Sequence, residues 1–205
     1  EDILMDDSIR YACMQVARGY GKTTLTSVFK PLHHILFDYP GSPKTVVLIS
    51  KTQDHAKSQL STIKDILDYS MEFRALFGYW GKESATVWRD DRIILKDGSS
   101  IHCKGIGMPI RGVNVKFVRP TLIVGDDMED ENNCKTPEAM DNNLMWLQKG
   151  VMPSVDMRYG RIIIIGTPIN ALCMVEKLEG DSLWKTLKFG TMNDNLSISL
   201  WEEMF

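Results

Sequence analysis

The chain has 205 residues, of which 43% are hydrophobic and 25% are charged, and its formal net charge is −3. This length and apolar content are enough to bury the core of one large domain, so we expect residues 1–205 to form a single domain. The longest apolar run, residues 162–165, is far shorter than the roughly 18 residues of a membrane span, and the acidic N-terminus lacks a signal-peptide pattern. These features exclude a membrane protein and indicate a soluble intracellular one. The acidic net charge also disfavours a protein that binds nucleic acid over its whole surface.

The predicted elements alternate between strands and helices. Apolar runs bounded by turn residues predict strands, and amphipathic runs predict helices. In chain order we predict a strand over 9–16, a helix over 23–37, a strand over 45–50, a helix over 53–68, a small antiparallel β insert over 86–105, a strand over 121–125, a helix over 136–149, a strand over 161–165, a short helix over 172–179 and a strand over 184–189. Pro31 is expected to kink the first helix or to end its first part, and Asp97-Gly98 predicts a hairpin turn. This alternation predicts an α/β fold with a mostly parallel sheet and helices on both faces.

The segment V-A-R-G-Y-G-K-T-T, residues 16–24, lies between the first strand and the first helix. A glycine-rich loop in this position binds phosphates through backbone N–H groups at the helix N-terminus. The segment differs from the G-x-x-x-x-G-K-[ST] pattern only at its first position, which is Val16. We expect Lys22 to reach the β- and γ-phosphates and the Thr23 hydroxyl to hold Mg²⁺. Arg18 would either touch the γ-phosphate or form a surface ion pair. The expected nucleotide-binding residues are Ala17, Arg18, Gly19, Tyr20, Gly21, Lys22, Thr23 and Thr24.

A hydrophobic strand that ends in two acids, L-I-V-G-D-D at 122–127, provides the expected metal and water chemistry. Asp126 is the first acid after the strand, and we expect it to bind Mg²⁺ through its water shell. A second carboxylate must orient and deprotonate the attacking water. Glu129 is the predicted base because its longer side chain reaches round the turn, and Asp127 is the competing candidate. Thr167, in R-I-I-I-I-G-T-P at 161–168, is predicted to sense the γ-phosphate from the tip of a third strand.

Five segments in this order resemble the large terminase subunit of tailed bacteriophages. They are R-G-Y-G-K-T-T, V-V-L-I-S-K-T-Q-D-H-A-K, I-R-G, R-P-T-L-I-V-G-D-D-M-E-D and I-I-I-I-G-T-P. The resemblance spans most of the chain, and the missing first glycine is normal for this family. It implies a RecA-like P-loop NTPase sheet that hydrolyses ATP with Mg²⁺. It also implies that this hydrolysis drives viral double-stranded DNA into a procapsid.

The resemblance covers the N-terminal ATPase domain of the family, and the C-terminal nuclease domain is expected to be absent from this chain. It implies the portal protein and the small terminase subunit as partners. It also implies a homo-oligomeric ring on the procapsid, a monomer in isolation and a location in the cytoplasm of the infected host cell. The family can carry an arginine that acts on a neighbour's nucleotide. Arg119 is the first candidate for it and Arg111 the second, although Arg119 fits a salt bridge at a strand start equally well. The residues that recognise adenine are left open.

Two other functions fit parts of the pattern. A helicase-like or remodelling P-loop ATPase that acts on nucleic acid would share the fold, but the chain shows no run of helicase motifs. A small-molecule kinase would need an arginine-rich lid and an acceptor other than water. The second acid pair and the G-T-P strand end favour the packaging ATPase.

Overall fold

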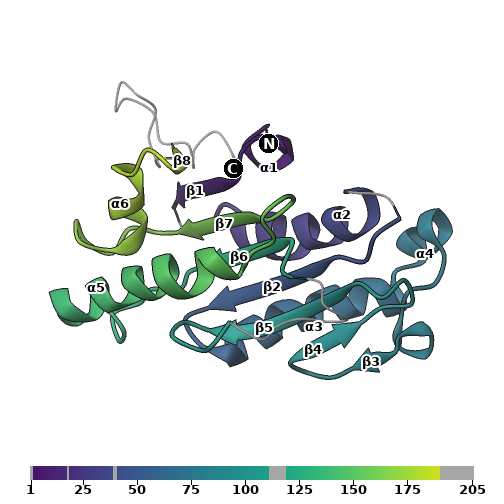
Figure 1. Ribbon diagram of the computed structural model, residues 1–205. Coiled ribbons are helices and arrows are strands. Elements are labelled where there is room, and N and C mark those ends of the chain that lie inside the picture. Colours follow the sequence, from purple (N-terminus) through teal and green to yellow (C-terminus); the bar gives the residue numbers. More distant parts are fainter. Residues whose placement is uncertain (1, 18, 39–40, 111–118, 190–205) are drawn as a thin grey trace, which may run out of the picture.

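An eight-stranded sheet forms the centre of the molecule, in the order β3-β4-β5-β2-β6-β7-β1-β8 (Figure 1). The computed structural model describes residues 2–17, 19–38, 41–110 and 119–189. The strands are β1 Tyr11–Val16, β2 Thr45–Ser50, β3 Val87–Trp88, β4 Arg92–Ile94, β5 Ser100–Gly105, β6 Leu122–Asp126, β7 Arg161–Gly166 and β8 Lys185–Phe189. The pairings from β5 through β8 are parallel, and those of β3 with β4 and of β4 with β5 are antiparallel. The predicted α/β fold with a mostly parallel sheet is therefore confirmed.

Helices cover both faces of the sheet, as predicted. The helical elements are α1 Asp2–Met5, η1 Thr24–Phe29, α2 Lys30–Phe37, α3 Gln53–Tyr69, α4 Met71–Phe77, η2 Lys82–Ser84, α5 Pro137–Trp146, η3 Leu147–Val151, η4 Met152–Ser154 and α6 Met174–Glu179. One core cluster joins the sheet to η1, α2 and α3, and a second joins it to η3 and α6 (Figure 1). Among the described helices, none has the length and apolar character to cross a membrane.

Strand β7 shows why the continuous apolar run forms a strand at the centre of the sheet. Ile163 and Ile165 belong to the core cluster with α2 and α3, whereas Ile162 and Ile164 belong to the cluster with α6. All residues of β7 are buried. A strand covered on both faces needs apolar side chains at every position, so it loses the alternation of a half-exposed strand.

The predicted small antiparallel β insert over 86–105 is present as β3, β4 and β5, and its last strand has a second partner. Strand β4 pairs in antiparallel fashion with β3 and with β5, and the predicted turn joins β4 to β5, with the Gly98 N–H donating to the Leu95 carbonyl oxygen at 3.0 Å. Strand β5, however, also pairs in parallel with β2 from Ser100 to Gly105. Strand β5 therefore joins the antiparallel insert to the parallel part of the sheet. The parallel partner of β5 lies about fifty residues earlier in the chain, where a local turn signal does not reveal it.

The first helix also differs from expectation. It continues through Phe37, but residues Thr24–Phe29 form a π-helical turn before α2 begins at Lys30. Pro31 lies in the first turn of α2, where its missing N–H is tolerated. The sequence reasoning also missed α4, which begins directly after α3 with the Ser70 hydroxyl accepting from the Phe73 N–H.

Candidate active site

The strand order brings the three sequence motifs to one edge of the sheet. Strand β7 lies between β1 and β6, and all three run parallel. Their carboxyl ends therefore meet where Val16 leads into the glycine-rich loop, where β6 ends at Asp126 and where Thr167 follows β7. The carboxyl edge of an open parallel sheet is the usual ligand-binding edge of such folds.

Lys22 lies at the centre of this edge and is 8% exposed. Its Nζ donates to Asp127 Oδ1 at 2.8 Å and to Thr167 Oγ1 at 2.6 Å. The Thr167 hydroxyl in turn donates to the Val16 carbonyl oxygen at 3.0 Å. Three predicted site residues are thus joined by direct hydrogen bonds across β1, β6 and β7.

The glycine-rich loop has the backbone that its glycines permit. Gly19 has φ 92° and Gly21 has φ 65°, both in the left-handed region that disfavours a side chain. A Cβ at Gly21 would meet no atom within 4 Å, so the backbone angle rather than packing requires glycine there. Ala17, Tyr20 and Thr24 lie around the loop with partial or full exposure. Arg18 and Arg111 lie outside the described residues.

Asp126 is the most buried acid of the site, at 2% exposure. Its Oδ2 accepts from Ser27 Oγ at 3.1 Å and from Gln59 Nε2 at 2.8 Å. Burial raises the pKa of the Asp126 carboxyl, and the negative charge of Asp127 adds to this, while the nearby Thr23 hydroxyl lowers it. Oδ1 is buried and has no hydrogen-bond partner among the described residues. A buried acceptor without a donor is costly, so Oδ1 together with Thr23 fits a cation such as Mg²⁺.

One carboxylate is sufficient for such a site. Among the residues that the structure describes, no group of three or more His, Cys, Asp or Glu side chains could hold a metal ion. Mg²⁺ bound with a nucleotide typically uses one or two protein carboxylates, and waters and phosphate oxygens complete its coordination. The Asp126 and Thr23 pair agrees with this mode and disagrees with an all-protein metal cage.

Sequence reasoning missed Ser27 and Gln59. Ser27 follows Thr23 by four residues and so shares its helix face, which is a local signal that could have identified it. Gln59 lies on α3, which packs against η1 and β2. Its contact with Asp126 depends on this packing, and no local pattern predicts it.

The two candidate bases are held by different parts of the molecule. Asp127 has φ 40°, a rare angle for a residue other than glycine, and its Oδ1 also accepts from the Thr167 N–H at 3.3 Å. Glu129 Oε2 accepts from the Met174 N–H at 2.5 Å, and its Oε1 accepts from Asn143 Nδ2 at 3.2 Å. Asp127 is therefore linked to Lys22 and Thr167, whereas Glu129 is linked to α5 and α6. Both acids line one open cleft of about 740 Å³.

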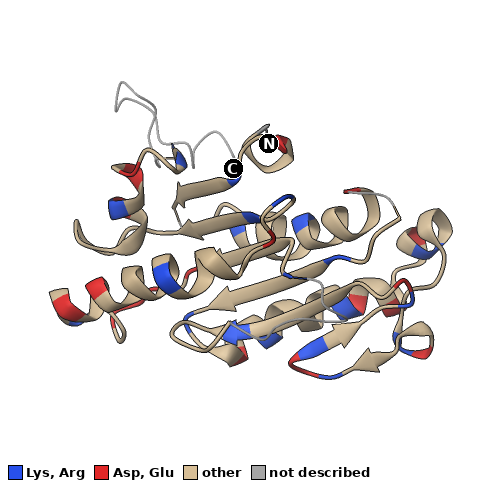
Figure 2. Ribbon diagram, in the orientation of Figure 1, with Lys and Arg blue, Asp and Glu red and all other residues tan. Residues whose placement is uncertain are grey.

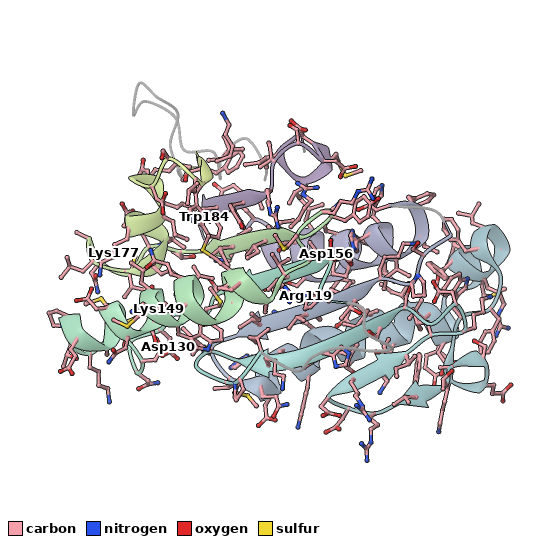
Figure 3. All side chains as sticks on the ribbon, in the orientation of Figure 1. Arg119, Asp130, Lys149, Asp156, Lys177 and Trp184 are labelled. Carbon is pink, nitrogen blue, oxygen red and sulfur yellow. The ribbon has the colours of Figure 1, made fainter. Side chains whose placement is uncertain are left out.

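Arg119 is not part of this site. It is exposed and precedes the amino end of β6, whereas Asp126 is at the carboxyl end (Figure 3). At about 3.3 Å per residue, the seven positions between them span roughly 20 Å. Its guanidinium is thus at the opposite edge of the sheet from its own Lys22. Figure 2 shows Lys and Arg positions interspersed with Asp and Glu positions along the described ribbon, in agreement with the formal net charge of −3.

The strand order, the left-handed glycines of the loop and the buried carboxylate at the end of β6 define a RecA-like α/β class of fold. Within this class, the structure is similar to the ATPase domain of the large terminase of Thermus phage P74-26, with a TM-score of 0.61 and 14% identity over 92% of this chain and 78% of that chain. It is also similar to the large terminase of the thermophilic bacteriophage D6E in complex with ADP, with a TM-score of 0.56 and 15% identity over 99% of this chain and 47% of that chain. For the HK97 bacteriophage large terminase, the TM-score is 0.54 and the identity 12%, over 94% of this chain and 38% of that chain.

These similarities establish the fold. The chain has the fold of large terminase ATPase domains, which confirms the resemblance inferred from its sequence motifs at that level. It spans less than half the length of the D6E and HK97 proteins. A scan against protein families and a search of curated proteins gave no match.

Proposed function

We propose that this chain is the ATPase domain of a viral DNA-packaging motor, in which ATP hydrolysis drives double-stranded DNA into a procapsid. The observation that carries this proposal is the hydrogen-bonded group of Lys22, Asp127 and Thr167 beside the buried Asp126. The group stands at the ligand-binding edge of a fold shared with large terminase ATPase domains. Residues 1–205 are proposed to form this one domain of a larger motor subunit.

ATP binding would redistribute the contacts of Lys22. Its Nζ now donates to Asp127 and Thr167, and a γ-phosphate at the loop would compete for the same donor. The ammonium group and the loop N–H groups would then neutralise charge that develops on the transferred phosphoryl group. Thr23 and Asp126 would hold Mg²⁺, which supplies further charge neutralisation when it is bound. Thr167 would change partner at the same time and so report the γ-phosphate to the segment after β7.

The contacts favour Asp127 over Glu129 as the general base, although the sequence pattern favours Glu129. When Lys22 turns to the phosphates, Asp127 Oδ1 loses its cationic partner and becomes able to accept a proton from water. Glu129 would first have to release the Met174 N–H at the start of α6. Glu129 then has a second role as the link between the site and the helices α5 and α6.

The nucleotide base is proposed to lie in an apolar pocket of about 300 Å³ that Lys22 also lines. This pocket lies between α1, the loop and β8, so it adjoins the phosphate site without overlapping the acidic cleft. Its apolar lining suits the stacking of a flat aromatic ring. The lining residues are Ile3, Leu4, Met14, Val16, Tyr20, Lys22, Leu25, Thr26, Ile165 and Phe189.

The proposed partners follow from the packaging function. They are double-stranded DNA, the portal protein, the small terminase subunit and further copies of this chain in a ring on the procapsid in the host cytoplasm. The isolated chain would be a monomer with slow turnover. The competing function, a helicase-like or remodelling ATPase, rests on the same fold and the same catalytic group, so only the stimulating partner separates the two.

ATP hydrolysis measured with and without linear double-stranded DNA and the portal protein tests the proposal. We expect hydrolysis that depends on Mg²⁺, is abolished in Lys22→Ala, and rises when both partners are present. Stimulation by single-stranded DNA or unfolded protein without any portal dependence would support the remodelling ATPase instead. Absence of hydrolysis and of nucleotide binding in the parent chain under all these conditions would contradict both functions.

A further inference from the structure

The Asp126 carboxylate is held in an asymmetric way. Its Oδ2 accepts two hydrogen bonds, from Ser27 Oγ at 3.1 Å and from Gln59 Nε2 at 2.8 Å. Its Oδ1 is buried and has no partner among the described residues. The two oxygens of this carboxylate therefore have different surroundings, although they are chemically equivalent. The donors on Oδ2 determine which oxygen is left for a ligand.

Gln59 is the stronger of the two donors by distance. A carboxylate can only accept hydrogen bonds when ionised, so the amide of Gln59 must present its Nε2 to Asp126. This orientation turns Gln59 Oε1 away from the donor contact, and Oε1 is also buried without a partner in the described part of the chain. The pair of side chains thus carries two buried acceptors that lack donors. A hydrated cation presents only donors, namely the O–H groups of its water ligands.

We propose that Gln59 is a positioning residue that holds the Asp126 carboxylate with Oδ1 toward Mg²⁺ and whose own Oε1 accepts from a water of the ion. This inference rests on the proposed nucleotide function and extends it to a residue on α3 that belongs to none of the three motifs. Partners of this kind orient metal-binding carboxylates, and their removal typically weakens metal affinity about 10- to 100-fold.

Two features of the fold fix this contact. Helix α3 is anchored by Ala56, Leu60 and Ile63, each 0% exposed, so Gln59 projects from a rigid helix. On the other side of the carboxylate, the π-helical turn η1 carries Ser27. Such turns are frequent at functional sites because they shift the direction of one side chain relative to a regular helix. The carboxylate is therefore held by side chains from two elements, α3 and η1, which also pack against each other.

The test is a Mg²⁺ titration of the binding of a fluorescent ADP analogue to the folded chain. Gln59→Leu keeps the approximate volume and removes both polar atoms. We expect the Mg²⁺ concentration at half-saturation to rise about tenfold or more, while ADP affinity in EDTA stays unchanged. Gln59→Met, a second variant of similar length, should behave in the same way. Thermal unfolding of each variant shows that the comparison is made on folded protein.

Gln53→Leu is the matched control. Gln53 lies on the same helix, but its Nε2 donates to the Cys103 carbonyl oxygen at 3.2 Å, so its substitution should leave the Mg²⁺ dependence at the parent value. The inference is overturned if Gln59→Leu reaches half-saturation at the same Mg²⁺ concentration as the parent while Asp126→Ala shows no Mg²⁺ dependence of ADP binding. A parent chain that binds the ADP analogue equally well in Mg²⁺ and in EDTA would overturn this inference alone, whereas a parent chain that neither binds the analogue nor hydrolyses ATP would contradict the proposed function as well.

Discussion

The amino edge and the carboxyl edge of the sheet both contain buried charged side chains, and the two sets differ in how completely they are paired. At the amino edge, His34 is fully buried and contacts Asp38 Oδ2 through Nδ1 at 2.6 Å and Thr121 Oγ1 through Nε2 at 2.8 Å. Lys30 Nζ adds an ion pair to the same Asp38 oxygen at 3.4 Å. Each of these groups has its partner within the fold.

At the carboxyl edge, the pairing is incomplete or exchangeable. Asp126 keeps one buried oxygen without a partner among the described residues, and Lys22 is held by Asp127, whose side chain is 46% exposed. A closed network stabilises one structure, whereas an open one can exchange its partners for a ligand. Burial of charge alone therefore does not identify an active site. Here the site differs in having a buried carboxylate oxygen of Asp126 without a partner among the described residues, next to an ion pair whose acid is exposed.

Arg119 offers the largest expected effect, and it would extend the function to the amino edge. Because it lies at the edge opposite its own Lys22, it can act only on the nucleotide of a neighbouring subunit. A guanidinium supplied in trans typically adds about 10³- to 10⁵-fold to the rate. We expect Arg119→Ala to reduce the turnover of the assembled protein by at least about 10³-fold, and the specific activity of the parent to rise with concentration.

A mixing experiment decides whether the arginine acts on the nucleotide of a neighbouring subunit or on that of its own chain. Arg119→Ala subunits mixed with subunits that lack the base should recover part of the activity, because some interfaces then combine an intact base with an intact arginine. Activity per chain that is independent of concentration, together with a mixture that stays inactive, would assign the role to an arginine in cis, namely Arg18. Recovery with Arg111→Ala but not with Arg119→Ala would move the role to Arg111.

Lys22→Ala should lower turnover by roughly 10²- to 10³-fold or more, because it removes the cation that stabilises the transition state. Lys30→Met at the amino edge is the matched comparison, since Lys30 is also buried but pairs with Asp38. It should lower the melting temperature and leave the turnover of the folded protein unchanged. Initial rates and thermal unfolding of both variants measure these effects. Parent-like hydrolysis in Lys22→Ala would show that the loop assignment is wrong.

Asp127→Asn and Glu129→Gln distinguish the two roles at the carboxyl edge. The amide keeps the shape of the acid but cannot accept the proton, and loss of a general base typically costs about 10²- to 10⁴-fold. On the contacts described above, Asp127→Asn should stall hydrolysis while ATP still binds with Mg²⁺. Glu129→Gln should cause a smaller loss by loosening the start of α6. Single-turnover rates reveal which variant stalls. If Glu129→Gln stalls hydrolysis and Asp127→Asn causes the smaller loss, Glu129 is the base, as the sequence pattern predicts.

Asp38→Asn tests the closed network. The substitution leaves His34 and Lys30 buried without their anion, and breaking one partner of a buried pair typically costs about 3–5 kcal/mol of unfolding free energy. Turnover of the folded protein should stay at the parent value, because Asp38 is at the opposite edge from Lys22. Urea unfolding and hydrolysis rates measured on the same samples provide the two readouts. A parent-like stability with reduced turnover would contradict the division between the edges.

The residues at the carboxyl edge were predictable because parallel strands bring their carboxyl ends to one edge of the sheet. Lys22 lies in the loop after β1, Asp126 ends β6 and Thr167 follows β7, so the alternation of strands and helices sufficed to bring them together. Gln59 was not predictable, because its contact exists only through the packing of α3 on η1.

The errors in the fold have a similar origin. The antiparallel pairing of β5 was predictable because the Asp97-Gly98 turn is a strong local signal, whereas the pairing of β5 with β2 is not local and was not predicted. Helix α4 contains no buried residue and so lacks the apolar periodicity on which a helix prediction depends. Local chemistry was therefore visible in the sequence, and contacts between distant elements were not.

His102 gives the smallest effect and tests the structural part of the sheet away from both edges. It lies on β5 opposite Arg92 of β4 and is 8% exposed. Burial, together with the positive charges of Arg92 and Lys104, lowers the pKa of His102 to about 4 against a small opposing effect of Asp91. Between pH 6.5 and about 4, the unfolded chain therefore binds a proton that the folded chain does not. Stability should fall as the pH falls through this range, by up to about 3 kcal/mol from this group.

His102→Gln should flatten that part of the curve of unfolding free energy against pH, whereas His55→Gln, a change at an exposed position of α3, should keep the parent curve. An unchanged slope in His102→Gln would assign the acid sensitivity to the His34 and Asp38 network instead.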